Sequence, residues 1–163
     1  MNILLLGKGG QVGWELQRAL APLGTVIAHD LDTADFSQPE QVAALVAAVR
    51  PDVIVNAAAH TAVDKAEGEP ELARLINATT PGAIAREAAK LGALLVHYST
   101  DYVFDGSGSA PRDEAAPTAP LSVYGSTKLE GEQLIQASGC PHLILRTSWV
   151  FGARGGNFAK TML

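Results

Sequence analysis

Tyr124 and Lys128 are the two residues of this sequence whose types and spacing are best suited to chemistry. They lie four positions apart in a segment that starts at Ser122, so they project from one face if the segment is helical. A phenol titrates near ~10, and a cation about 4 Å away stabilises its phenolate by roughly 4 kcal/mol at an effective dielectric of about 20. The spacing therefore predicts a general acid beside a cation, provided that water is partly excluded. It also fits an exposed pair on a solvated helix, so the rest of the chain has to decide.

A glycine-rich turn near the N-terminus predicts a phosphate-binding site. Residues 3–6 form a short apolar run typical of a buried parallel strand, and an amphipathic helix is expected over residues 12–23. Glycines at three-residue intervals separate the two elements. Backbone N–H groups at a helix start bind a pyrophosphate when no β-carbon blocks the approach. The residues expected to bind a dinucleotide here are Gly7, Gly9, Gly10, Gln11, Val12 and Gly13.

An acidic residue follows the second predicted strand, residues 25–29. Asp30 stands where a carboxylate can accept hydrogen bonds from the ribose of NADH, although Asp32 and Asp35 are close competitors. Asp35 and Phe36 are expected to hold the edge and the face of an adenine. Lys8, inside the glycine turn, could instead neutralise a 2'-phosphate, so NADH and NADPH both remain open.

Small and polar residues follow the third and fourth predicted strands, residues 52–55 and 94–98. A flat ligand can lie against the backbone where side chains are small, which places the middle of the cofactor at the carboxyl end of the third strand. His60 is interpreted as lining the cleft rather than shuttling a proton, and Asn77 as reaching the sheet edge. The residues expected at this end of the sheet are Ala57, Ala58, Ala59, Thr100, Asp101 and Tyr102.

Strands and helices alternate through the chain, with a fifth strand expected over residues 142–146. This alternation predicts an α/β fold, a Rossmann-like doubly wound parallel sheet with helices on both faces. Residues 1–146 are expected to form the NAD(P)-binding domain and residues 147–163 the start of a substrate-binding portion. A carbonyl held by Thr100 and Tyr124 would receive a hydride at its carbon and a proton from the phenol.

The composition restricts the class of protein. The chain has 163 residues, 47% hydrophobic and 18% charged, which suits one globular domain. A net charge of −5 without a long basic run argues against nucleic acid or an anionic membrane surface as the main partner. The single cysteine, Cys140, favours a reduced, cytoplasmic setting, and no run is apolar and long enough for a membrane span.

Several blocks of sequence together resemble one enzyme family. The glycine turn, Thr100 and the Tyr124/Lys128 pair are similar to the extended short-chain dehydrogenase/reductase superfamily. More specifically, the chain resembles the dTDP-4-dehydrorhamnose reductases. The blocks that carry this resemblance are residues 56–59, 62–64, 99–106, 123–125, 146–150 and 157–162.

The resemblance implies NADH- or NADPH-dependent reduction of a 4-keto dTDP-sugar to dTDP-L-rhamnose, a precursor of surface polysaccharide. It implies Thr100, Tyr124 and Lys128 as catalytic residues and places Trp149 against the sugar. Lys128 is expected to contact the nicotinamide ribose as well. Tyr124 is likewise expected to contact the cofactor. The residues expected to contact the substrate are Val63, Thr100, Asp101, Tyr102, Trp149 and Asn157.

Two departures from the family pattern stand out. His60 occupies a position where a phenol is expected, and the family's chain continues well past Leu163. The family's magnesium dependence and homodimer contacts involve that later part, so no metal ligand and no dimer residue is assigned here. Two other functions remain open: a sugar-nucleotide epimerase of the same superfamily, which retains NAD tightly, and a non-catalytic NAD(P)-binding subunit like that of methionine adenosyltransferase.

Overall fold

A five-stranded sheet forms the centre of the molecule. The computed structural model describes residues 1–163, and all neighbouring strands pair in parallel. The order across the sheet is β2-β1-β3-β4-β5. The prediction of a doubly wound parallel sheet is therefore confirmed. Each strand begins and ends within two residues of the expected positions. The strands are β1 (Asn2–Leu6), β2 (Thr25–His29), β3 (Val53–Asn56), β4 (Leu94–Thr100) and β5 (His142–Thr147).

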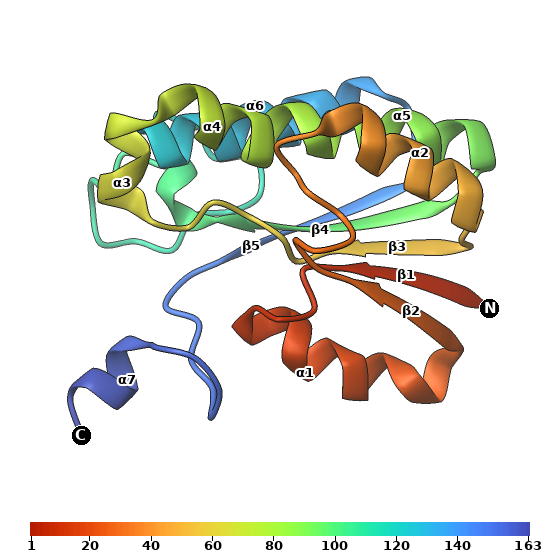
Figure 1. The fold of residues 1–163 in the computed structure, drawn as a ribbon. Coiled ribbons are helices and arrows are strands. Elements are labelled where there is room, and N and C mark those ends of the chain that lie inside the picture. Colours follow the sequence, from red (N-terminus) through yellow and green to blue (C-terminus); the bar gives the residue numbers. More distant parts are fainter.

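Helices cover both faces of the sheet. Figure 1 shows α1 on one face and α2, α5 and α6 on the other. The expected first helix ends at Leu20, and a short 3₁₀ turn continues to Leu23. The helical segments are α1 (Gln11–Leu20), η1 (Ala21–Leu23), α2 (Pro39–Val49), α3 (Val63–Gly68), α4 (Pro70–Arg74), η2 (Leu75–Thr79), α5 (Thr80–Leu91), η3 (Asp101–Val103), α6 (Val123–Ala137) and α7 (Phe158–Thr161). None of them combines the length and hydropathy needed to cross a membrane.

Side chains of the central strands alternate between two apolar layers. Leu4 and Leu6 of β1 belong to the larger core, beneath α2, α5 and α6, whereas Ile3 and Leu5 face the α1 side. Successive residues of a strand point to opposite faces, so a strand covered on both sides reads as a continuous apolar run. This is why residues 3–6 are all buried.

The strand order creates a crevice at the carboxyl end of β1. The chain passes from β1 to β2 on one side and then returns to place β3 on the other side of β1. The connections that follow β1 and β3 therefore diverge, and open α/β sheets bind ligands at such a switch point. Both the glycine turn and the residues after Asn56 lie at this position.

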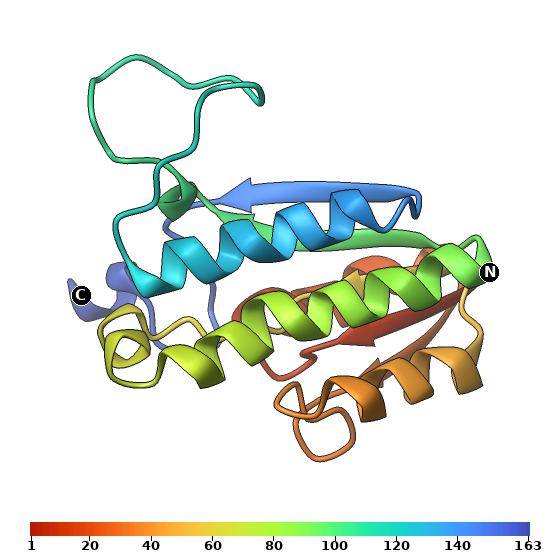
Figure 2. The same ribbon diagram turned by 90° about the horizontal axis from the view of Figure 1, so that it is seen from above.

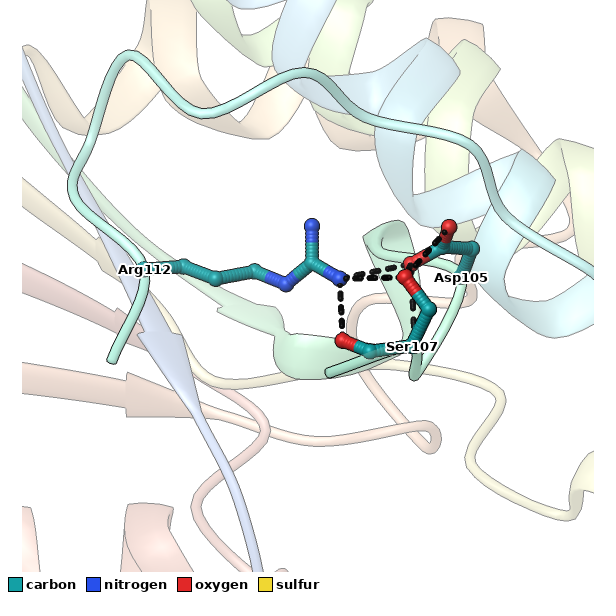
Figure 3. A network of polar contacts seen from close by, with 3 residues as sticks. All are labelled: Asp105, Ser107 and Arg112. Atoms are coloured by element: carbon teal, nitrogen blue, oxygen red, sulfur yellow. Dashed lines mark hydrogen bonds and ion pairs between the residues drawn. The ribbon is translucent and has the colours of Figure 1, made fainter. Parts of the chain in front are cut away.

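A long connection between η3 and α6 projects beyond the sheet, as Figure 2 shows. Within this connection, Arg112 donates hydrogen bonds to Asp105 Oδ1 (2.6 Å) and to the carbonyl of Ser107 (2.7 Å), as drawn in Figure 3. The guanidinium groups of Arg112 and Arg146 each lie 5.1 Å from the centroid of the Phe104 ring. These contacts hold the loop against β5, next to the strand end that carries Thr100.

Candidate functional site

The glycine turn after β1 forms an open cradle at the start of α1. Gly7 has a positive φ of 83°, which only glycine adopts without strain, and a β-carbon at Gly13 would collide with the Gly7 carbonyl. α1 therefore packs directly on the turn. At Gly10 an added β-carbon would meet only the Gly7 oxygen, at an ordinary 3.6 Å. The N-terminus of α1 is thus accessible to a phosphate.

A cleft of about 290 Å³ lies along this turn and the end of β3. Most of its lining residues are small or apolar, and two are carboxylates. This arrangement fits a dinucleotide, with room for its phosphates at the glycines and for its flat rings against the alanines. The lining residues are Gly7, Gly10, Asp30, Leu31, Ala34, Asp35, Phe36, Ala57, Ala58, Ala59 and Ile76.

Asp30 and Asp35 line this cleft, whereas Asp32 does not. The Asp30 carboxylate accepts a hydrogen bond from the Leu31 N–H (2.9 Å), and a β-carbon at Gly9 would collide with it. Asp35 accepts from the Ser37 N–H (2.8 Å). Phe36 is 5% exposed and belongs mainly to the core, so it offers only a small edge to the cleft.

Lys8 extends along β2, and its Nζ donates to the Ala28 carbonyl (3.4 Å). Both Lys8 and Asp30 thus lie around the end of β2, where the choice between NADH and NADPH would be made.

Asn77 joins the end of β3 to α6. It lies in a single π-helical turn, η2, and is buried. Its Oδ1 accepts from the His60 N–H (2.8 Å), and its Nδ2 donates to the His60 carbonyl (3.1 Å) and to Thr127 Oγ1 (3.2 Å). π-Helical turns occur frequently at functional sites. Asn77 therefore holds the loop after β3 in register with the helix that carries Tyr124.

The His60 side chain connects to the helical segments rather than to Tyr124. Its Nε2 donates to the Glu69 carboxylate (2.6 Å), which also pairs with Lys65 (3.0 Å). Its Nδ1 is buried without a hydrogen-bond partner.

Thr100 and Asp101 share a small hydrogen-bond network at the end of β4. The Thr100 hydroxyl donates to Asp101 Oδ1 (3.1 Å) and accepts from the Tyr102 N–H (3.2 Å). The other carboxylate oxygen of Asp101 accepts from the Ser148 hydroxyl (2.7 Å). The carboxyl ends of β4 and β5 are thereby linked at the position predicted for substrate chemistry.

Tyr124 lies in the first turn of α6, directly beside this network. The Ser122 hydroxyl caps the helix by accepting from the Gly125 N–H (3.1 Å), and Gly125 packs against the Tyr102 carbonyl so closely that a β-carbon would not fit. Burial raises the pKa of Tyr124 above its ordinary value, the Thr100 hydroxyl opposes this shift, and Asp101 adds to it. The structure thus brings together Thr100, Asp101, Tyr102 and Tyr124.

Lys128 differs from the arrangement expected from the sequence. Its side chain is 1% exposed, and Nζ donates to the Tyr98 carbonyl (2.6 Å) and lies 3.2 Å from His97 Nε2. The expected lowering of the Tyr124 pKa by Lys128 is absent, because the cation is not among the groups that shift it. The helical spacing was correct, but β4 supplies buried partners that the spacing does not reveal.

His97 and Asn56 are buried polar residues, connected to Lys128, to which the sequence analysis gave no role. Both are completely buried, and His97 Nδ1 lies 3.0 Å from Asn56 Nδ2. The available signal was a histidine and an asparagine inside apolar strands, where each needs a buried hydrogen-bond partner.

Four other predicted residues lie at the margins. Trp149 is 75% exposed and packs edge to face on Phe158, with centroids 5.2 Å apart. Asn157 donates to Gln11 Oε1 (3.0 Å), which brings the last segment to the glycine turn. Val12 and Val63 are half-buried near the starts of α1 and α3.

A larger hollow of about 640 Å³ lies along β5 and is bordered by Asp101, Arg112, Glu132 and Arg146. It lacks the glycine turn and the alanines, so it does not fit a dinucleotide as the smaller cleft does. No group of three or more His, Cys, Asp or Glu side chains is arranged to hold a metal ion.

Comparison with known proteins identifies the family of this chain. Residues 1–163 match the family described as RmlD substrate binding domain. The chain belongs to the RmlD family. Its sequence is 64% identical over 167 aligned residues to the dTDP-4-dehydrorhamnose reductase of Escherichia coli (strain K12), covering 100% of this chain and 56% of that protein.

Solved structures of RmlD relatives have the same fold. A dTDP-4-dehydrorhamnose reductase from Clostridium acetobutylicum is 43% identical with a TM-score of 0.94, covering 99% of this chain and 58% of that one. The dTDP-4-dehydrorhamnose reductase of Bacillus anthracis, solved in complex with NADP, is 39% identical with a TM-score of 0.93 and the same two coverages. The RmlD chain described here spans about half the length of the curated relatives that it matches.

Proposed function

We propose that the protein containing this chain reduces the 4-keto group of dTDP-4-dehydro-6-deoxy-L-mannose to dTDP-L-rhamnose, using NADH or NADPH. This reaction belongs to nucleotide-sugar biosynthesis for surface polysaccharide. The observation that carries the proposal is the convergence of Thr100, Asp101 and Tyr124 at the end of β4, in an RmlD-family chain with a dinucleotide-shaped cleft. The names of the relatives support the choice of substrate.

The reaction requires a hydride at the carbonyl carbon and a proton at the carbonyl oxygen. A reduced nicotinamide dinucleotide, when bound, supplies the hydride. Tyr124 donates the proton as general acid, and its raised pKa keeps the phenol protonated near neutral pH. Thr100 orients the carbonyl by turning its hydroxyl hydrogen from Asp101 toward the substrate oxygen. Asp101 then retains its bond from Ser148.

The cleft residues supply the cofactor site. Backbone N–H groups at the start of α1 bind the pyrophosphate, and Asp30 accepts from the adenosine ribose. Residues 57–59 line the same cleft, where the flat rings of the cofactor would lie. Completing the proposed cofactor set are Gly7, Gly9, Gly10, Gln11, Val12, Gly13, Asp35, Phe36, Asn77, Tyr124 and Lys128. The proposed substrate set is Val63, Thr100, Asp101, Tyr102, Trp149 and Asn157.

We also propose that residues 1–146 form the dinucleotide-binding domain and residues 147–163 begin the substrate-binding portion. In support, the last strand of the sheet ends at Thr147, and several large apolar side chains beyond it are exposed, among them Trp149, Phe151 and Phe158. The buried free thiol of Cys140 supports a reduced, cytoplasmic setting. No magnesium ligand and no dimer contact is assigned to these residues.

The test is oxidation of NADH and of NADPH by the full-length protein supplied with dTDP-4-dehydro-6-deoxy-L-mannose. Stoichiometric formation of dTDP-L-rhamnose is expected. Tightly retained NAD with interconversion of sugar epimers would instead identify an epimerase. Dinucleotide binding without turnover of any 4-keto sugar nucleotide would identify a binding subunit.

A further inference from the structure

A line of buried polar groups runs from the end of β3 to the middle of α6. The Ala58 N–H donates to Asn56 Oδ1 (3.1 Å), and Asn56 Nδ2 lies 3.0 Å from His97 Nδ1. His97 Nε2 then lies 3.2 Å from Lys128 Nζ, which donates to the Tyr98 carbonyl (2.6 Å). The side-chain members, Asn56, His97 and Lys128, are at most 1% exposed, so the line is shielded from bulk solvent.

The hydrogen positions along this line follow from what each group can do. A backbone N–H can only donate, so the amide atom of Asn56 that faces Ala58 is the oxygen. The amide NH₂ of Asn56 therefore faces His97 and donates to Nδ1, which must be unprotonated. In a neutral imidazole the proton then resides on Nε2. That N–H points at Lys128 Nζ, and a hydrogen bond between the two requires a lone pair on the lysine nitrogen.

We infer that His97 is a positioning residue, which donates its Nε2–H to Lys128 and holds that side chain as a neutral amine on β4 rather than beside the Tyr124 phenol. The amine in turn donates one of its hydrogens to the Tyr98 carbonyl. An ammonium group has no lone pair, so it cannot accept from His97, and protonation of Lys128 must break this contact.

The charges around Lys128 agree with a neutral amine. From α6, Glu132 faces it and raises its pKa, but that carboxylate is already paired with Arg146 of β5 (2.6 Å) and accepts from the Ser99 hydroxyl (2.5 Å). No carboxylate forms an ion pair with Lys128 itself. Burial dominates and lowers the pKa of Lys128 to about 8, so the neutral amine that can accept from His97 is the main form above that pH. Burial lowers the pKa of His97 well below its ordinary value, and Lys128 lowers it further when it is protonated, so the imidazole is neutral in both states of the lysine.

The inference explains why Lys128 does not lower the pKa of Tyr124 in this structure. Tyr124 is one helical turn away on α6, yet the lysine nitrogen is engaged by two groups of β4. Release from His97 as an ammonium group is then the step that makes a cation available to the phenol. The inference concerns Lys128 above about pH 8 in the protein without ligand and stands on its contacts, so failure of the proposed reductase activity would leave it intact.

The decisive measurement is the tautomer of His97 in the ¹⁵N-labelled full-length protein without ligand. Two-bond ¹H–¹⁵N correlation spectra distinguish a protonated Nε2 from a protonated Nδ1, and the His97→Gln variant assigns the signal by its absence. A neutral ring with its proton on Nε2 is expected above about pH 8. A proton on Nδ1 in the wild-type protein would overturn the inference without recourse to any variant.

The Asn56→Asp variant tests the cause of the tautomer. Both oxygens of the new carboxylate accept, one from the Ala58 N–H and the other from His97, so the volume is kept but the donor to Nδ1 is lost. His97 Nδ1 is expected to become protonated. An unprotonated Nδ1 in this variant, with the fold intact by circular dichroism, would contradict the direction assigned to the hydrogen bonds.

Titration of Lys128, followed through its ¹³Cε resonance, separates positioning from simple packing. In His97→Leu the amine loses its donor, so its midpoint should rise by about one pH unit, a tenfold gain in proton affinity. His97→Gln, which keeps an amide donor, should restore much of the wild-type midpoint. Equal midpoints in wild type and His97→Leu would show that His97 only fills space.

Discussion

The ring of Tyr102 meets the ring of Tyr124 edge to face, with centroids 5.6 Å apart and planes inclined by 74°. Tyr102 is half-exposed, whereas burial raises the pKa of Tyr124. The outer ring therefore shields one side of the inner one. Because Tyr102 lies two residues after Thr100 in the same turn, the end of β4 both places a hydroxyl beside the phenol and limits its access to water.

Replacement of Tyr124 by phenylalanine should remove the proton donor and leave the shape of the site intact. We expect kcat to fall by about 10²- to 10⁴-fold, with dinucleotide affinity nearly intact in a fluorescence titration, because Tyr124 is only one of many proposed cofactor contacts. Tyr98→Phe is the matched control, because that ring packs against the cluster of Ile3, Leu5 and Val55 and takes no part in the site. Full activity of Tyr124→Phe would remove this residue from the mechanism.

Asp30→Ala should distinguish the ribose-binding acid from its neighbours. Loss of a hydrogen bond to a carboxylate costs about 1.5–3 kcal/mol, so the Kd for NADH should rise by roughly tenfold or more, and the Kd for NADPH by less. Asp32→Ala is the control, since Asp32 lies outside the cleft. Equal losses of NADH and NADPH affinity in Asp30→Ala would show that its carboxylate does not contact the ribose.

Two alanine substitutions in the glycine turn should have different effects. Gly13→Ala places a methyl group against the Gly7 carbonyl. We therefore expect the free energy of unfolding, measured by urea denaturation, to fall by about 1–3 kcal/mol. Gly10→Ala meets only an ordinary contact and should leave stability nearly unchanged, yet weaken dinucleotide binding by obstructing the start of α1. Similar stability losses in both variants would contradict the packing assigned to Gly13.

In Lys128→Met, the free energy of unfolding should change less with pH in the alkaline range than it does in the wild-type protein. The pKa of Lys128 is about 8 in the folded protein and near 10.5 when the side chain is exposed in the unfolded chain. Between these two pH values the unfolded chain binds more protons than the folded protein, so wild-type stability rises with pH. The variant lacks this contribution, which amounts to about 3 kcal/mol over the whole window.

The measurement is the difference between wild-type and Lys128→Met free energies of unfolding from pH 7 to 10.5, since other titrating groups cancel in it. The variant should be the more stable protein at pH 7, and its advantage should shrink as the pH rises. A difference that stays constant with pH would mean that Lys128 titrates equally in the folded and unfolded states.

Local patterns in the sequence determined the elements and the glycine turn. Apolar runs such as residues 3–6, bounded by glycine and turn residues, predict strands because burial on both faces leaves no polar alternation. The spacing of Gly7, Gly10 and Gly13 indicated a phosphate-binding turn, because the strand end, the glycines and the helix start that such a turn requires all lie within a few residues of one another. Thr100 and Tyr124 were identified from their position after a strand and at a helix start, which the strand order then brought together.

Only the tertiary structure decided the partners of Lys128 and the role of Asn77. Helical spacing places Lys128 on the same face as Tyr124, but the direction of its long side chain depends on what β4 offers, and His97 and the Tyr98 carbonyl lie about thirty residues away in sequence. The side-chain partners of Asn77 likewise are His60 and Thr127, which come from two other segments. A buried polar group must find its partners wherever packing places them, so sequence alone reveals the need for a partner and not its identity.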